Sequence, residues 1–308
     1  MPRDVSPTAP SAATDTESAP PGETADLPVR ICEDWLIPVE PGHAVDEGWL
    51  PHTQGRPVGV TWHWTATASL LECSRLIGGP QAARRGVASA HYGIGRTREE
   101  GIARYVSLEN RSWHAGRQQT LRWDGQLKST EDWKGARTTI GVETTNLGFA
   151  GDHLPAGPDW RTVDTPDGRQ RLQIQPWTEA QLRMMIQVGR EIVERWPTIR
   201  PQDHHGHHDL CPGYKLDVCG FPFAEVLRGI YRDPSIPDVW SPYWLNGDRR
   251  AALAELGYGD GVASEAPTHW GLADDIALRR FQMDHDLPPV GVWTTATSWR
   301  IHAARRLA

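Results

Sequence analysis

One helix constrains the fold more than any other feature of this 308-residue chain. Thr178 and Gln181 have the spacing of a capping box, and Pro197 ends the helical pattern. The residues of one stripe of that helix are Leu182, Met185, Ile186, Gly189, Ile192, Val193 and Trp196. Short β-like runs at 58–64, 102–108 and 138–143 precede it. Strands mixed with helices predict an α/β domain with a central sheet.

Composition divides the chain into four parts. Residues 1–28 are rich in Pro, Ser, Thr and Ala and have no aromatic residue, which predicts a disordered tail. Residues 29–231 have the composition of a globular domain, and the Pro-rich segment 232–245 is typical of a linker. Residues 246–308 are predicted to form a small helical domain, with helices at 248–256, 272–284 and 295–306.

Charge and hydropathy exclude several classes of function. The formal net charge of −7 argues against a nucleic-acid-binding face. No stretch approaches the roughly 20 consecutive apolar residues that a membrane span needs. Residues 1–28 show neither the basic start nor the apolar run of a secretory signal, so we expect synthesis in the cytoplasm. We also expect a monomer.

The strongest chemical signal is the segment 203–220, which reads DHHGHHDLCPGYKLDVCG. It contains four His residues together with Asp, Cys and Lys, and its Gly and Pro content predicts an irregular loop. A zinc site would take two or three ligands from this segment and at least one from elsewhere. The natural remote candidate is His63, at the end of a β-like run. The alternative for the segment is a polar loop that faces solvent.

Motifs in a fixed order connect these candidates to a known family. They are WHWTAT around His63, SAHYGIGR at 89–96, WHAG at 113–116, TIGVETTN at 139–146, and GHHD followed by KLD at 206–217. In this order, over about residues 58–223, the chain resembles the zinc-dependent N-acetylmuramoyl-L-alanine amidases of type 2. Peptidoglycan recognition proteins share that fold. The resemblance implies a central mixed β-sheet flanked by helices.

The resemblance also implies roles for individual residues. His63, His207 and Asp217 would bind Zn²⁺, and an open fourth position would hold water. Glu143 would take a proton from that water and pass it to the leaving amine. Lys215 would face the oxyanion of the tetrahedral intermediate.

Four further residues match family positions beside the cleft. We expect His91, Trp113, His114 and Asn146 to shape the cleft or to contact substrate rather than to bind metal.

The cysteines of the same segment leave two questions open. Cys219 could compete with Asp217 as the third ligand, although the spacing from His207 favours Asp217. Cys211 and Cys219 could form a disulfide, or both could be free thiols. The resemblance assigns no role to the remaining histidines of the segment, which we interpret as loop residues: His204, His205 and His208.

The C-terminal part has a resemblance of its own. Residues 246–301 look like the peptidoglycan-binding type 1 module, a three-helix domain. Its core would contain Leu253, Leu256, Leu278, Phe281 and Leu287. Asp286, Val290 and Thr294 replace the Gly, Asp and Gly of the module's turn, which favours the fold over the binding function.

Together these resemblances imply an enzyme whose partner is peptidoglycan. It would hydrolyse the amide between the lactyl group of N-acetylmuramic acid and L-alanine. The C-terminal module would hold it on the polymer, and it would act at the cell wall after release or injection. Two alternatives stay open: a non-catalytic peptidoglycan receptor on the same fold, and a zinc peptidase that cuts within the stem peptide.

Overall fold

A computed structural model describes most of the chain beyond its first residues. The described residues are 28–34, 51–52, 55–78, 88–115, 135–212, 215–259 and 269–307. The tail expected to be disordered lies outside them, except for Pro28, and so does Gly116 of the WHAG motif. Among the described residues, no helix is both long and apolar enough to cross a membrane.

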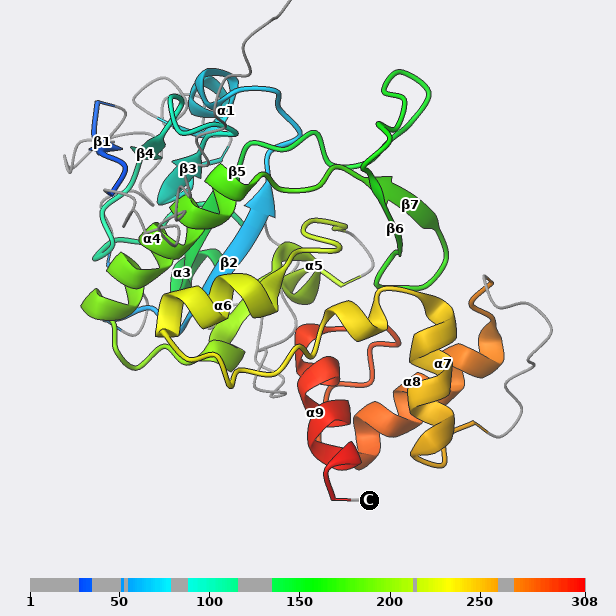
Figure 1. Ribbon diagram of the computed structural model, residues 1–308. Helices are drawn as coiled ribbons and strands as arrows, with labels where there is room; N and C mark the ends of the chain where they lie inside the picture. Colours follow the sequence, from blue (N-terminus) through cyan, green and yellow to red (C-terminus); the bar gives the residue numbers. More distant parts are fainter. Residues whose placement is uncertain are drawn as a thin grey trace, which may run out of the picture.

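A six-stranded mixed sheet forms the centre of the molecule (Figure 1), with the strand order β1-β4-β3-β5-β2-β8. Strands β3 and β4 are antiparallel, and the other neighbours are parallel. The strands are β1 (Ile31–Cys32), β2 (Gly59–Trp64), β3 (Tyr92–Ile94), β4 (Ile102–Arg104), β5 (Thr139–Thr144) and β8 (His204–Gly206). This sheet, flanked by helices, confirms the predicted fold class.

Two long helices cover one face of the sheet (Figure 1): α4 (Glu179–Arg195) and α6 (Phe223–Tyr231). Helix α4 is the helix that the sequence predicts, and its capping box of Thr178 and Gln181 is present. Three shorter helices belong to the same part of the chain: α1 (Leu70–Ile77), α3 (Gly135–Thr138) and α5 (His207–Leu210).

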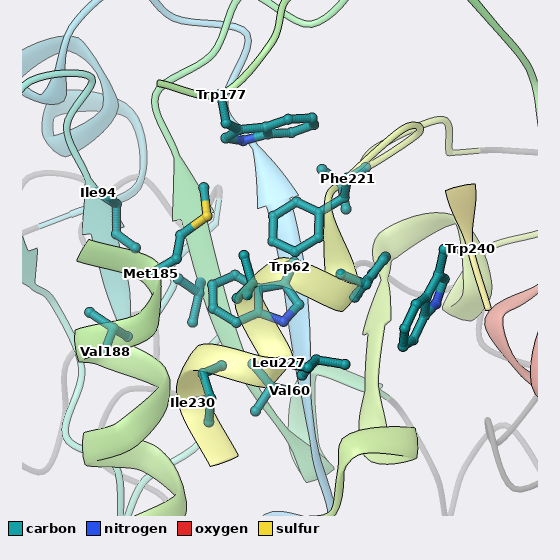
Figure 2. Close-up of a cluster of buried hydrophobic side chains, with 14 of the residues drawn as sticks. Val60, Trp62, Ile94, Trp177, Met185, Val188, Phe221, Leu227, Ile230 and Trp240 are labelled. Carbon is teal, nitrogen blue, oxygen red and sulfur yellow. The ribbon is translucent and has the colours of Figure 1, made fainter. Parts of the chain in front are cut away.

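The main hydrophobic core fills the space between the sheet and these two helices (Figure 2). Val60 and Trp62 of β2 are fully buried there, against Leu227 and Ile230 of α6. Because successive side chains of a strand point to opposite faces, Thr61 and His63 of β2 point away from this core. The other face of the sheet is therefore the one that can carry a polar site.

In the described residues of the C-terminal part, 246–259 and 269–307, three helices form where the sequence predicts them. Their core includes four of the five predicted residues, and Leu256 packs against it. The helices are α7 (Asn246–Glu255), α8 (Leu272–Asp284) and α9 (Thr295–Arg305). A hairpin of β6 (Arg161–Asp164) and β7 (Arg171–Ile174) lies beside them (Figure 1).

The segment that precedes these helices is packed rather than exposed. Ile236, Val239 and Trp240 are buried in the main core, and Trp240 stacks on Phe223 with a ring separation of 5.0 Å. A short 3-10 helix, η3 (Ser241–Tyr243), then leads to α7. The division of the chain into domains stays a prediction, but these contacts fix residues 236–240 to the sheet-containing part.

The His-rich segment is not the irregular loop that its Gly and Pro content predicts. It begins at the last residue of η2 (Pro201–Asp203) and contains strand β8 and then helix α5. Pairing with β2 at the edge of the sheet explains the difference, because it satisfies backbone groups that a loop would leave to water.

The α4–α6 contact predicts the effect of Gly189→Ala. A Cβ at Gly189 would overlap the buried Ile230 side chain of α6. Alanine improves helix propensity by about 1 kcal/mol, but overpacking a core costs about 1–3 kcal/mol. We therefore expect the free energy of unfolding to fall on balance, as measured by denaturant titration.

The matched background is Ile230→Ala, which removes both overlapping atoms, Cδ1 and Cγ1. In that background Gly189→Ala should cost less, giving a positive coupling in a double-mutant cycle. An equal cost in both backgrounds would contradict the steric explanation.

Candidate metal centre

The carboxyl ends of three parallel strands gather the site. His63 of β2 and Glu143 of β5 are register partners, so both side chains lie on the face opposite the main core. His207 follows β8 directly, and β8 is the other neighbour of β2. The carboxyl ends of parallel strands lie at the same end of a sheet, and ligands commonly bind at that end.

Three potential ligands converge at the carboxyl ends of these strands. The Asp217 Oδ2 atom lies 2.9 Å from His63 Nδ1 and 3.0 Å from His207 Nδ1. One ligand atom from each of these residues lies within 4.8 Å of the others. Among the described residues this is the group able to hold a metal ion, and Cys219 is not part of it. The structure thus brings together the three ligands that the resemblance implies.

The charges at the site favour an ionised carboxylate. Burial alone would raise the pKa of Asp217, but the charge of His207 and its hydrogen bond to the carboxylate hold it well below its usual range. Burial alone would lower the pKa of His207, but Asp217 raises it to about 10. A metal ion would take the place of that proton, since only the neutral imidazole binds metal.

His114 determines which nitrogen of His63 faces the ligand group. His114 Nε2 lies 3.2 Å from the Thr139 carbonyl oxygen, to which it can only donate. His114 Nδ1 is then an acceptor, and it takes the Nε2–H of His63 at 3.0 Å. The His63 Nδ1 atom that faces Asp217 therefore carries a lone pair. Burial lowers the pKa of His63 to about 4, which keeps this ring neutral.

This arrangement fits a metal ion and disfavours an empty site. His63 Nδ1 and Asp217 Oδ2 are both acceptors in this tautomer, and at 2.9 Å they repel each other unless a cation lies between them. Two imidazole nitrogens and one carboxylate oxygen are also a donor set of catalytic zinc sites. Gly141 on β5 contributes by its small size, because a Cβ there would overlap the His114 ring.

Glu143 lies next to the ligands without joining them. Its Oε1 atom is 3.9 Å from His63 Nδ1, and its buried Oε2 atom has no hydrogen-bond partner. Burial, followed by the charge of Asp217, raises the pKa of Glu143 to about 8. The charge of Lys215 acts in the opposite direction, which places that side chain within electrostatic reach of the site. Such a carboxyl group can both accept and release a proton near neutral pH.

Two of the residues predicted near the cleft have no exposed side chain. The Nε2–H of His91 donates to the Asn110 carbonyl at 2.8 Å, and its Nδ1 accepts from the backbone N–H of Gly141. Asn146 donates to the Gln175 carbonyl and is fully buried. Through these contacts both residues hold the backbone around the site rather than present a side chain to solvent.

Trp113 lies half-buried, and its backbone pairs with Ser89. A substrate contact by Trp113 stays a prediction.

The histidines predicted to be loop residues, His204, His205 and His208, are buried and take part in the hydrogen bonds of the framework. The Trp62 indole N–H donates to His204 Nδ1 at 3.2 Å, and the His204 Nε2–H reaches the Tyr231 hydroxyl at 3.0 Å. The backbone N–H of His208 donates to the Asp217 carbonyl at 2.7 Å. No local sequence pattern could reveal the contacts of His204, because Trp62 lies 142 residues before it and Tyr231 lies 27 residues after it.

The described cysteines are not joined by disulfides. Cys211 and Cys219 are both buried and form no disulfide. The Cys211 thiol lies 3.2 Å from the Ala115 carbonyl oxygen, to which it donates. Burial raises the pKa of the Cys219 thiol, which makes it a poor source of the thiolate that a metal requires.

One family model matches the chain. The family described as N-acetylmuramoyl-L-alanine amidase matches residues 53–214, more than half of the chain. No curated protein matches the chain.

Solved structures similar to the chain include AmpDh3 from Pseudomonas aeruginosa. It is 21% identical with a TM-score of 0.45, over 82% of this chain and 92% of that one. Another is the N-acetylmuramyl-L-alanine amidase AmiD from E. coli, in complex with the substrate anhydro-N-acetylmuramic acid-L-Ala-D-γ-Glu-L-Lys. It is 20% identical with a TM-score of 0.46, over 82% of this chain and 90% of that one.

The contact between His114 and His63 predicts a measurable loss of metal affinity in His114→Leu. Leucine fills the buried site but cannot accept the His63 Nε2–H, so the ligand loses its fixed tautomer. Removing such a partner typically weakens metal binding about 10–100-fold. Competition with a chromophoric chelator measures the affinity for Zn²⁺.

His114→Asn is the matched control, because its amide oxygen can take the place of Nδ1. It should retain more of the affinity than His114→Leu. Equal affinity in His114→Leu and in the unaltered chain, with circular dichroism unchanged, would rule out this role.

Proposed function

This chain belongs to the N-acetylmuramoyl-L-alanine amidase family, and from that premise we propose that it is a zinc-dependent peptidoglycan hydrolase. The bond cleaved is the amide between the lactyl group of N-acetylmuramic acid and the L-alanine of the stem peptide. The observation that carries the proposal is the convergence of His63, His207 and Asp217 beside a buried carboxyl group, Glu143. Zn²⁺, bound by the first three residues, would polarise the scissile carbonyl and make a water molecule nucleophilic near neutral pH.

Glu143 performs the proton transfers. Among the described residues its buried Oε2 atom has no hydrogen-bond partner, so a water bound at the metal would satisfy it. Its raised pKa allows the carboxylate to accept the water's proton and then to donate it to the leaving amine of L-alanine. Without that proton the amine would leave as an anion, which is far less favourable.

Lys215 supplies a fixed positive charge. Its charge lowers the pKa of both His63 and Glu143, so its field acts at the reaction centre. A positive charge in a largely buried site stabilises the oxyanion that develops when water adds to the carbonyl. This role uses electrostatics alone and does not require Lys215 to exchange a proton.

The complete site favours an enzyme over a receptor. A receptor on this fold needs neither the third ligand nor the proton-transferring carboxyl, whereas this chain has both beside each other. A peptidase that cuts within the stem peptide would use the same groups, so the site geometry does not separate it from an amidase. Action at the cell wall and a monomeric state stay predictions.

The separate roles of the ligands and Glu143 predict two different phenotypes. Asp217→Ala should lose both bound zinc and activity, because it removes a ligand. Glu143→Gln should keep zinc and thermal stability, while turnover falls roughly 10²–10⁴-fold because the amide cannot accept the proton. Metal content by mass spectrometry is measured on the same samples as turnover. Near-normal turnover of Glu143→Gln would show that another group moves the proton.

The proposed bond predicts the products. Sacculi digested with the zinc-loaded protein should release stem peptides with a free amino terminus at L-alanine, and glycan strands without peptides. Mass spectrometry of the soluble and insoluble fractions distinguishes the outcomes, with Glu143→Gln as the control. Fragments cut within the stem would identify a peptidase instead, and binding without any release would identify a receptor.

A further inference from the structure

Asp209 holds the backbone turn that carries the ligand His207. It is the third residue of α5, and its Oδ2 accepts the backbone N–H of Gly206 at 2.8 Å. Gly206 directly precedes His207, so this bond closes the first turn of the helix in the manner of a capping box. Asp209 is 95% buried, since its exposed fraction is 5%. Its position therefore affects where the His207 side chain begins.

The same carboxylate is held from the other side by the C-terminal helices. Thr295, the first residue of α9, donates its backbone N–H to Asp209 Oδ1 at 2.7 Å. Its hydroxyl donates to Asp209 Oδ2, also at 2.7 Å. The first N–H groups of a helix have no partner within the helix, and the N-terminus of a helix favours a negative charge. In Figure 1 the first turn of α9 is the end of that helix nearest α5.

Asp209 is also connected to the other side of the metal centre. His208 Nε2 lies 3.5 Å from Asp209 Oδ1. The backbone N–H of His208 donates to the carbonyl oxygen of the ligand Asp217 at 2.7 Å. One buried carboxylate thus lies between the turn before His207 and the backbone of Asp217.

The C-terminal helices are attached rigidly enough to transmit this contact. Arg249 of α7 is buried and donates to the carbonyl oxygens of Thr165, at 2.7 Å, and Asp164, at 3.1 Å. The backbone N–H of Asn246 donates to the Asp164 carboxylate at 2.7 Å. Burying an arginine costs free energy unless its N–H groups are paired, so these contacts require a fixed arrangement of α7 on the β6–β7 hairpin.

We propose that Thr295 is a positioning residue for the metal centre, through its two hydrogen bonds to Asp209. The C-terminal helices then complete the catalytic site in addition to any contact with the polymer. This inference rests on the proposed function for its metal, but it concerns the binding of the metal rather than the reaction. A simple tether would affect activity on intact sacculi alone, whereas a positioning residue affects the metal in the absence of any substrate.

The test compares three single variants of the full-length chain. Thr295→Val has nearly the same shape but loses the hydroxyl donor, and Thr295→Ser keeps both donors. Thr297→Val is the matched control from the same turn of α9. Its buried hydroxyl pairs with Thr294 and Gln282 of the C-terminal part, and not with Asp209.

Two readouts report on the metal site directly. They are the affinity for Zn²⁺ by chelator competition, and the visible absorption spectrum of the Co²⁺-substituted protein. We expect Thr295→Val to weaken Zn²⁺ binding about 10-fold and to change the Co²⁺ spectrum, as the loss of an outer partner does. Thr295→Ser should stay within about twofold of the unaltered chain, and Thr297→Val should lose thermal stability without a change at the metal.

The outcomes separate this inference from the proposed function. Unchanged Zn²⁺ affinity and Co²⁺ spectrum in Thr295→Val would overturn the inference, whatever the chain hydrolyses. The same metal changes in Thr297→Val would also overturn it, because they would show a general effect of destabilising α9. Altered metal binding in Thr295→Val alone supports the inference even if digestion of sacculi reveals a different reaction.

Discussion

The parallel pairing of β2 with β5 is the constraint on which the site depends. Its register aligns His63 with Glu143, while Val60 and Trp62 of β2 are locked into the main core on the opposite face. A shift of one residue would move His63 into that core and expose apolar side chains, so burial on one face specifies the polar arrangement on the other. The arrangement of the ligand group thus depends on hydrophobic packing on the opposite face of the sheet.

Behind the ligands, hydrogen bonds connect side chains across three strands. His63 donates to His114, which contacts Thr139 Oγ1 at 3.2 Å. The hydroxyl oxygens of Thr139 and Thr61 lie 3.0 Å apart, and the Thr61 hydroxyl oxygen lies 2.9 Å from His205 Nε2. These groups are buried, so each needs its partner to avoid a desolvation cost. A fully paired network of this kind restricts the rings to one orientation, which presents a lone pair of His63 to the ligand group.

Local patterns explain what could be predicted from the sequence. Helix α4 has a capping box, an apolar stripe and a terminating proline, all within 20 neighbouring residues of the chain. His63 and Glu143 lie in short apolar runs, and ordered family motifs identified them. Strand β8 could not be predicted, because its pairing partner lies about 140 residues earlier and its sequence is polar. The burial of His91 also depends on distant backbone groups, so its motif position alone suggested a place beside the substrate.

The metal centre also couples binding to folding. In the protein alone, the lone pair of His63 faces the carboxylate of Asp217, and water screens the two only weakly because their side chains are 2% and 12% exposed. A cation between them turns this repulsion into attraction only in the folded chain, because His63 lies more than 140 residues before the other two ligands. Anything that binds the native state alone stabilises it.

The contact from Thr295 to Asp209 extends this coupling to the C-terminal helices. Metal binding and the docking of α9 then stabilise the same turn from opposite sides, so each favours the other.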